Sequence, residues 1–214
     1  MCRGGSMIQN EKKEHILMLL RKLQTDRTLE KAEFVELIKN RALIEDELFQ
    51  ISKEIHVENF HRKVYVRGLI EISSYCGNDC YYCGIRRSNR NAKRYRLRAE
   101  EIYEQVRFGT KLGFKSFVLQ GGEDPGFSDK TLIEVIKEIK RINPQTAITL
   151  SVGEKPFETL KAYKEAGADR FLLRHETRDK EHYYKLHPRD MDQDFRLHML
   201  EDLKELGFQT GSGI

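Results

Sequence analysis

The sequence predicts an α/β fold: a partial (β/α) TIM-type barrel with parallel strands, preceded by N-terminal helices. Two observations lead to this prediction. From residue 63 onward, short apolar runs typical of strands alternate with amphipathic stretches of helical period. Three of those stretches end at a glycine just before the next apolar run, at Gly113, Gly167 and Gly207, as helix C-caps do. Parallel strands need a crossover helix between neighbours, so this alternation favours a barrel.

The first 62 residues are expected to form a separate helical segment. Ile16, Leu19 and Leu23 recur at helical spacing, and Thr28 is the expected N-cap of a second helix. A third stretch with helical period extends from residue 43 to about 57. None of these helices carries evident chemistry, and we expect them to cover an open edge of the domain that follows.

Residues 63–214 are expected to form the barrel, incomplete at its C-terminal end. Four strand-and-helix units and the start of a fifth are predicted. The expected strands are 64–72, 116–120, 147–151 and 170–174, with a fifth beginning at 208. The expected helices are 99–112, one around 132–139, 156–166, 180–186 and 192–206. Because the predicted sheet stops at its fifth strand, we expect the chain to be a truncated form of a larger barrel.

Composition bounds the protein class. The 214 residues are 39% hydrophobic and 34% charged, with a net charge of +4 and a mean hydropathy of −0.64. No apolar run approaches the roughly 20 residues that cross a bilayer, and the N-terminus lacks a signal-peptide core. We therefore expect a cytoplasmic protein without membrane contact, in a compartment where thiols stay reduced.

The densest basic run extends from Arg86 to Arg98. Such a run is one signature of nucleic-acid binding. Few aromatic residues are interleaved with it, and it adjoins the cysteine motif described next. We therefore expect no nucleic-acid partner, and interpret the run as a solvated connection or a docking patch for an acidic electron donor.

Cys76, Cys80 and Cys83 follow the first predicted strand at spacing C-x3-C-x2-C. Three thiolates on one loop can ligate three irons of a four-iron cluster, which leaves the fourth iron open to a substrate. A zinc site would need a fourth ligand, but the nearest histidines, His61 and His175, lie well outside the loop. Three cysteines cannot pair among themselves, and the fourth, Cys2, lies in a terminal segment. The spacing favours an iron–sulfur cluster and leaves zinc as the alternative.

Polar residues also follow the later strands, where a barrel places its active site. Gln120 precedes a Gly-Gly-Glu-Asp segment, whose glycines would let a ligand reach the backbone or simply form a turn. Thr149 and Ser151 share one face of the third strand because strand side chains alternate. Arg174 and Glu176 end the fourth strand, where they would meet a charged ligand or pair with each other.

The cysteine motif resembles that of the radical S-adenosylmethionine (SAM) enzymes, which place an aromatic residue before the last cysteine, here Tyr82. The resemblance implies a [4Fe-4S] cluster whose open iron binds SAM and whose electron cleaves it to a 5′-deoxyadenosyl radical. Longer segments narrow the match to the HydE family of [FeFe]-hydrogenase maturases, in the group that also holds biotin synthase and methylornithine synthase. They are residues 76–87, 119–125, 149–154, 165–177 and 203–213.

Carried over by position, the resemblance implies roles for single residues. The three cysteines would hold the cluster. Tyr82 would place the adenine of SAM, and Ser151, Glu176 and Arg196 would bind SAM. Gln120 and Thr149 would face a substrate chamber inside the barrel.

The same resemblance implies an activity and partners. HydE-like enzymes act on an organometallic iron–cysteine substrate supplied by a companion maturase, during H-cluster assembly. They take electrons from a low-potential donor such as ferredoxin or flavodoxin. Two alternatives stay open: a methylornithine synthase-type mutase, and a truncated, non-catalytic protein that binds an iron–sulfur cluster and SAM.

Overall fold

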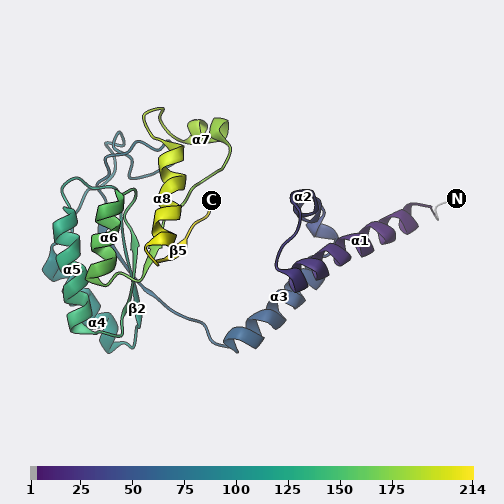
Figure 1. Cartoon of the computed structure of the whole chain (residues 1–214), viewed down its shortest axis with the longest axis horizontal. Helices are drawn as coiled ribbons and strands as arrows, with labels where there is room; N and C mark the ends of the chain where they lie inside the picture. The colour runs from purple at the N-terminus through teal and green to yellow at the C-terminus, as the bar shows by residue number, and fades with distance from the viewer. Residues whose placement is uncertain (1–3) are drawn as a thin grey trace. The chain divides into compact units, whose positions relative to one another are not determined.

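A computed structural model describes residues 4–214, so Cys2 lies outside the described residues. The chain divides into two compact units, one extending to Tyr65 and the other from Val66 to Ile214. Each unit is described by itself (Figure 1). None of the described helices is long and apolar enough to cross a membrane.

The first unit is helical and has its own small core. It contains α1 (Gly4–Asp26), α2 (Lys31–Lys39), a 3-10 turn (Arg41–Leu43) and α3 (Glu45–Phe60). Its buried side chains include Ile16, Leu20, Leu37 and Ile44. The expectation that Thr28 caps the second helix is wrong. The cap is Glu30, whose N–H donates to the Glu33 carboxylate at 2.9 Å.

The second unit contains a five-stranded parallel sheet with strands in chain order, β1-β2-β3-β4-β5. This confirms the predicted α/β class and parallel topology. The strands are β1 (Gly68–Ser73), β2 (Ser116–Gly121), β3 (Ala147–Ser151), β4 (Arg170–Leu172) and β5 (Gln209–Gly211). Chain order without reversal is the order of a β/α barrel wall.

One face of the sheet is packed against helices (Figure 1). Alternate strand residues such as Leu119, Ile148, Leu150 and Phe171 meet helix residues in one core. The connecting helices are α4 (Ala99–Lys111), α5 (Asp129–Ile142), α6 (Phe157–Ala166), α7 (Lys180–Leu186) and α8 (Gln193–Glu205). The three expected glycine caps are confirmed, because Gly113, Gly167 and Gly207 all have positive φ.

Two expected strands are longer than the observed ones. The first was expected to begin at 64, but residues 64–67 have no strand partner, and Val64 is 86% exposed. The first pair in the register of β1 and β2 is Gly68 with Phe117, near the start of β2. Residues 64–67 therefore have no residue of β2 beside them. The fourth strand ends at Leu172 rather than at Arg174, although Leu173 N–H still donates to Gly211 O at 3.0 Å.

The opposite face of the sheet carries a row of polar side chains. The register places Glu71 beside Gln120 and Gln120 beside Ser151. One layer below, Val118 pairs with Thr149. In a barrel this face lines the interior, so the row marks the mouth at the carboxyl ends of the strands.

Phe117 fills the space between β1 and α4 because Gly68 on β1 and Gly109 on α4 leave room for its ring. A Cβ on Gly109 would lie 2.7 Å from that ring. Gly109→Ala is expected to lower the free energy of unfolding by about 1–3 kcal/mol through overpacking, although alanine is the better helix former. Urea unfolding measures the change.

The control is Gly84→Ala, since a Cβ there meets nothing within 4 Å. Phe117→Leu should restore part of the loss in the Gly109→Ala background. Equal stability of the Gly109→Ala variant and the parent would contradict the packing described.

Candidate active site

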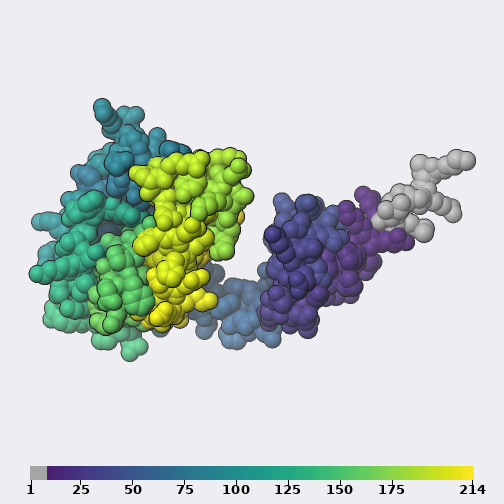
Figure 2. Space-filling view, turned by 45° about the horizontal axis from the view of Figure 1, so that its top comes forward, coloured from purple at the N-terminus to yellow at the C-terminus, as the bar shows by residue number. Residues whose placement is uncertain are grey.

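The cysteine loop lies at the carboxyl end of β1. Its backbone N–H groups donate hydrogen bonds to the loop after β2 and to the end of α7. Gly77 N–H donates to Glu123 O at 2.8 Å, and Tyr81 N–H donates to Leu186 O, at the end of α7, at 2.9 Å. The loop and α7 lie at the same end of the sheet in Figure 1, and they adjoin in the space-filling view of Figure 2. A short, fixed loop keeps its thiols at one end of the barrel wall.

Cys76, Cys80 and Cys83 are free thiols, each partly buried. Burial raises the pKa of Cys76, whose sulfur accepts the Asn78 N–H at 3.4 Å. Burial also raises the pKa of Cys80 to about 11, against the lowering effect of Arg196, and the other two thiols add to the rise. The three sulfurs therefore lie close enough to interact electrostatically.

The basic run that follows the cysteines is largely part of this scaffold. The guanidinium of Arg94 donates to four backbone carbonyls, those of Ser74, Ile85 (2.8 Å), Arg86 (2.8 Å) and Asn89 (3.3 Å). The expectation of a solvated run is therefore wrong for Arg94, since its charge is satisfied inside the loop. Arg87, Arg90 and Lys93 remain exposed.

The Gly-Gly-Glu-Asp segment packs directly against the cysteine loop. A Cβ on Gly122 would collide with the carbonyl oxygen of Tyr75 and lie 2.6 Å from the Cys76 Cβ. A Cβ at Gly122 therefore has no room, as expected where two loops meet, whereas Gly121 lines the cavity described below. Glycine is required at position 122 for that close approach.

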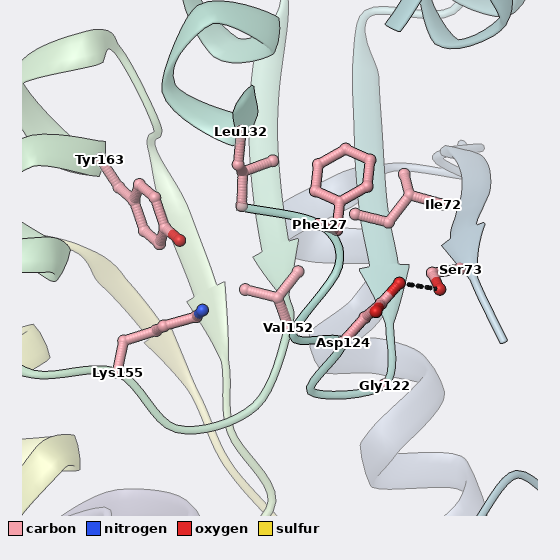
Figure 3. A pocket seen from close by; sticks show the side chains of 9 residues that line it. All are labelled: Ile72, Ser73, Gly122, Asp124, Phe127, Leu132, Val152, Lys155 and Tyr163. Atoms are coloured by element: carbon pink, nitrogen blue, oxygen red, sulfur yellow. Dashed lines mark hydrogen bonds between the residues drawn. The ribbon is translucent and has the colours of Figure 1, made fainter. Parts of the chain in front are cut away.

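Asp124 joins three parts of the chain. Its carboxylate accepts the Ser73 hydroxyl at 2.5 Å (Figure 3). Arg96 donates two further hydrogen bonds to this carboxylate, both at 2.6 Å. It also accepts the Gly126 N–H at 2.8 Å, and its side chain is only 2% exposed. The Arg96 guanidinium lowers the pKa of Asp124 to about 2. This carboxylate ties β1, the basic run and the loop after β2 together.

A cavity of about 260 Å³ opens at the same end of the sheet. It brings together Gln120, Ser151 and Arg196, three of the residues predicted to contact SAM or substrate, and Arg174 also lines it. Thr149 is buried beneath, and its hydroxyl has no hydrogen-bond partner. A polar cavity of this size, lined by two arginines, suits a ligand that carries a carboxylate.

Arg196 extends from α8 into the cavity wall and is 7% exposed. Its Nε donates to Glu154 Oε1 at 2.6 Å, and its Nη1 donates to Arg174 O at 3.0 Å. Glu123 lies nearby, and its Oε1 accepts the Glu154 N–H at 3.0 Å. Burial raises the pKa of Glu154 despite the ion pair. Two carboxylates and one guanidinium thus share a partly dry site.

Tyr82 and Glu176 also meet, as the hydroxyl of Tyr82 donates to Glu176 Oε1 at 3.0 Å. Burial, and then this bond, raise the pKa of Tyr82. The alternative of an Arg174–Glu176 ion pair is not found among the ion pairs of residues 4–214. Glu176 turns instead toward the cysteine loop, with a left-handed φ of 64°.

Sequence reasoning missed two residues of α7 beside this site. Tyr183 and His187 are fully buried, and their rings stack with centroids 4.1 Å apart. The Tyr183 hydroxyl has no hydrogen-bond partner. Helical period predicted α7, but the two tyrosines and two histidines of residues 182–187 carry no spacing signal that singles out Tyr183 and His187. Only the packing of α7 on the cysteine loop identifies them.

The donor set fits an iron–sulfur cluster. It consists of three thiols, free of disulfides, on one ordered loop, and the buried Tyr183 hydroxyl, which lacks a partner, lies near Cys80. Within residues 4–214, no three His, Cys, Asp or Glu side chains converge as ligands of one metal ion. A four-iron cluster takes one cysteine per iron, so its ligands need not converge on a point.

Comparison with known families agrees with this chemistry. Residues 70–214 match the family described as the Radical SAM superfamily. The chain belongs to the Radical SAM superfamily. That membership implies a [4Fe-4S] cluster and SAM as cofactors, and the motif cysteines 76, 80 and 83 are all present.

Among curated proteins, the chain is 44% identical over 191 residues to the [FeFe] hydrogenase maturase subunit HydE of Thermotoga maritima. That match covers 86% of this chain and 54% of the relative. It is 32% identical over 143 residues to the 3-methylornithine synthase of Methanosarcina acetivorans, covering 66% of this chain and 40% of that protein. The chain thus spans about half the length of the curated relatives it matches.

Solved structures give the same fold. Methylornithine synthase (PylB) superposes with a TM-score of 0.74 at 26% identity, covering 94% of this chain and 55% of that one. The hydrogenase maturase HydG superposes with a TM-score of 0.81 at 24% identity, covering 94% of this chain and 46% of that one. At 24% identity, the second match supports the fold alone.

The Asp124 contacts predict a pH-dependent stability. The folded-state pKa of Asp124 is about 2, below its unfolded value near 3.9. Its contribution of about 2 kcal/mol is therefore complete above pH ~4 and is lost as pH falls toward 2. Urea unfolding of the parent and of Asp124→Asn should differ by about that amount at pH 6, with the difference shrinking at pH 3.

Asp190→Asn serves as the control, because Asp190 is exposed. It should leave the free energy of unfolding unchanged at both pH values. A difference between the parent and Asp124→Asn that stays constant from pH 6 to pH 2 would show that the carboxylate charge is not what holds the loops.

Proposed function

We propose that this chain uses its cysteine loop to hold a [4Fe-4S] cluster and binds SAM in the adjoining cavity, as a HydE-like enzyme of [FeFe]-hydrogenase H-cluster maturation. The observation that carries the proposal is the position of the three partly buried thiols beside a cavity lined by Ser151 and Arg196. When bound, such a cluster supplies the electron that cleaves SAM to a 5′-deoxyadenosyl radical.

In this proposal Cys76, Cys80 and Cys83 ligate the cluster. Burial raises the pKa of Cys76 and of Cys80, which favours their neutral thiols, so binding iron must release their protons. Hydrogen bonds such as that from Asn78 N–H to the Cys76 sulfur then stabilise the thiolate.

SAM would lie across the cavity mouth. Tyr82 offers its ring to the adenine from the cysteine loop, and Glu176 offers a carboxylate beside it. Arg196 is the fork donor for the carboxylate of SAM, and Ser151 is a neutral hydrogen-bond partner in the same wall. Gln120 and Thr149 would face the substrate chamber, which the inner face of the sheet lines.

The HydE-like substrate class is supported by the 44% identity to the Thermotoga maritima protein. It implies an organometallic iron–cysteine substrate, companion maturases and a low-potential donor such as ferredoxin or flavodoxin. A mutase acting on lysine is the second candidate, favoured by the match to PylB at 26% identity.

Anaerobic reconstitution with iron and sulfide is expected to give a four-iron signal that SAM perturbs. Cys80→Ala should lose most of the bound iron, because a missing cysteine leaves a cluster iron without its protein ligand. The matched control is Cys2→Ala, which lies outside the motif and should retain the cluster. Iron content and electron paramagnetic resonance measure both.

Reductant and SAM should then yield 5′-deoxyadenosine. A stoichiometric zinc site without iron uptake would contradict the proposal. A cluster that forms but releases no 5′-deoxyadenosine would favour the non-catalytic alternative. Conversion of added lysine to 3-methylornithine would assign the mutase activity instead of maturation.

Arg196 can be tested for binding separately from stability. Arg196→Met should lower the free energy of unfolding by about 3 kcal/mol, because it leaves Glu154 buried without its partner. Adding Glu154→Gln should restore part of that stability, since only the more exposed Glu123 carboxylate then lacks the guanidinium. Urea unfolding measures both variants.

SAM affinity should not follow stability. The double variant Glu154→Gln, Arg196→Met is expected to fold but to bind SAM at least tenfold more weakly than Glu154→Gln alone, a loss of about 1.4 kcal/mol or more. Equal affinity of these two proteins would remove Arg196 from the SAM site.

A further inference from the structure

His187 lies at the end of α7, is fully buried, and contacts the residue that precedes the last cysteine. Its Nε2 lies 3.4 Å from the hydroxyl of Tyr82. The two rings meet edge to face, with centroids 5.5 Å apart and an interplanar angle of 88°. No role from the cluster or from SAM binding has been assigned to this histidine.

The hydrogen bond on its other nitrogen fixes the tautomer of His187. Nδ1 lies 3.0 Å from the carbonyl oxygen of Tyr183, one helical turn earlier. A carbonyl only accepts, so Nδ1 carries the proton. Burial lowers the pKa of His187, which favours the neutral ring. Nε2 is therefore an acceptor that faces the Tyr82 hydroxyl.

Two acceptors thus compete for one proton. The Tyr82 hydroxyl has a single hydrogen and lies 3.0 Å from Glu176 Oε1 and 3.4 Å from His187 Nε2. The shorter contact, to a carboxylate, takes the hydrogen in the structure described. His187 is left as a second acceptor within reach of the same hydroxyl.

The two acceptors differ in how firmly they are held. His187 is stacked on Tyr183 at 4.1 Å with rings 19° from parallel, and it caps the end of α7 with its backbone N–H donating to Tyr183 O at 2.9 Å. Glu176 lies on the loop after β4 with a left-handed φ of 64°. A ligand that engages the Glu176 carboxylate would withdraw it from Tyr82, whereas the histidine would stay in place.

We infer that His187 is a positioning residue that accepts the Tyr82 hydroxyl when SAM engages Glu176. The inference rests on the proposed function, in which Tyr82 places the adenine and Glu176 binds SAM. The exchange keeps the tyrosine ring oriented at the cluster loop while freeing the carboxylate for the ligand. No bond other than hydrogen bonds forms or breaks.

A double-mutant cycle tests this inference on the reconstituted 214-residue chain. His187→Gln and His187→Met are matched in length, and both remove the ring, but only glutamine offers a strong acceptor near the position of Nε2. SAM affinity is measured by calorimetry and by titrating the cluster signal with SAM. Each His187 variant is measured with Tyr82 intact and again in the Tyr82→Phe background, which forms the second arm of the cycle.

His187→Met is expected to weaken SAM binding about fivefold to tenfold, the size of one net hydrogen bond. His187→Gln should stay within about twofold of the parent. In the Tyr82→Phe background the glutamine and methionine variants should bind SAM equally, because no hydroxyl remains to be held.

Since both His187 variants lose the same ring stacking, a merely structural role would lower both affinities and both melting temperatures alike. Equal SAM affinity of the two variants, or a difference that persists in Tyr82→Phe, overturns the assignment of His187. If the unaltered chain with its cluster binds no SAM, the proposed function fails together with this inference.

Discussion

The buried carboxylate of Asp124 is the contact on which the rest of the site depends. It accepts hydrogen bonds from Ser73, Arg96 and Gly126 and is only 2% exposed. Through it, the loop after β2 is bound to the end of β1 and to the basic run, while Gly77 joins the same loop to the cysteines. Together with the Tyr81–Leu186 bond and the Arg94 contacts, this network holds three thiols in place on a loop without regular secondary structure.

The second constraint is a concentration of charge in a partly dry site. Arg196 neutralises Glu154 with Glu123 close by, and its guanidinium lowers the pKa of Cys80 against the larger effect of burial. The cysteine loop and the cavity lined by Ser151 and Arg196 are therefore linked electrostatically through Arg196. Such an arrangement suits a site that must accept both a metal cluster, whose thiolates are negative, and a zwitterionic ligand.

Much of the fold could be predicted because its signals are periodic and local. Apolar runs that alternate with amphipathic stretches predicted parallel strands, which the structure shows in chain order. Glycines predicted as helix C-caps have positive φ in the structure. Element ends were less predictable. Residues 64–67 are apolar enough for a strand but have no partner, since pairing begins at Gly68 and Phe117. A propensity cannot show where a neighbouring strand begins.

The sequence by itself determined the chemistry: three cysteines at C-x3-C-x2-C with Tyr82 between the last two, and polar residues at the strand ends. The tertiary structure decided which side chains share those ends. Asp124 meets Arg96 from 28 positions away, and Tyr82 meets His187 from 105 positions away. Contacts so distant in the chain depend on sheet register and on how loops pack, and neither is encoded in local spacing. His187, which directly follows α7, therefore became visible as part of the site only once that helix was placed against the cysteine loop.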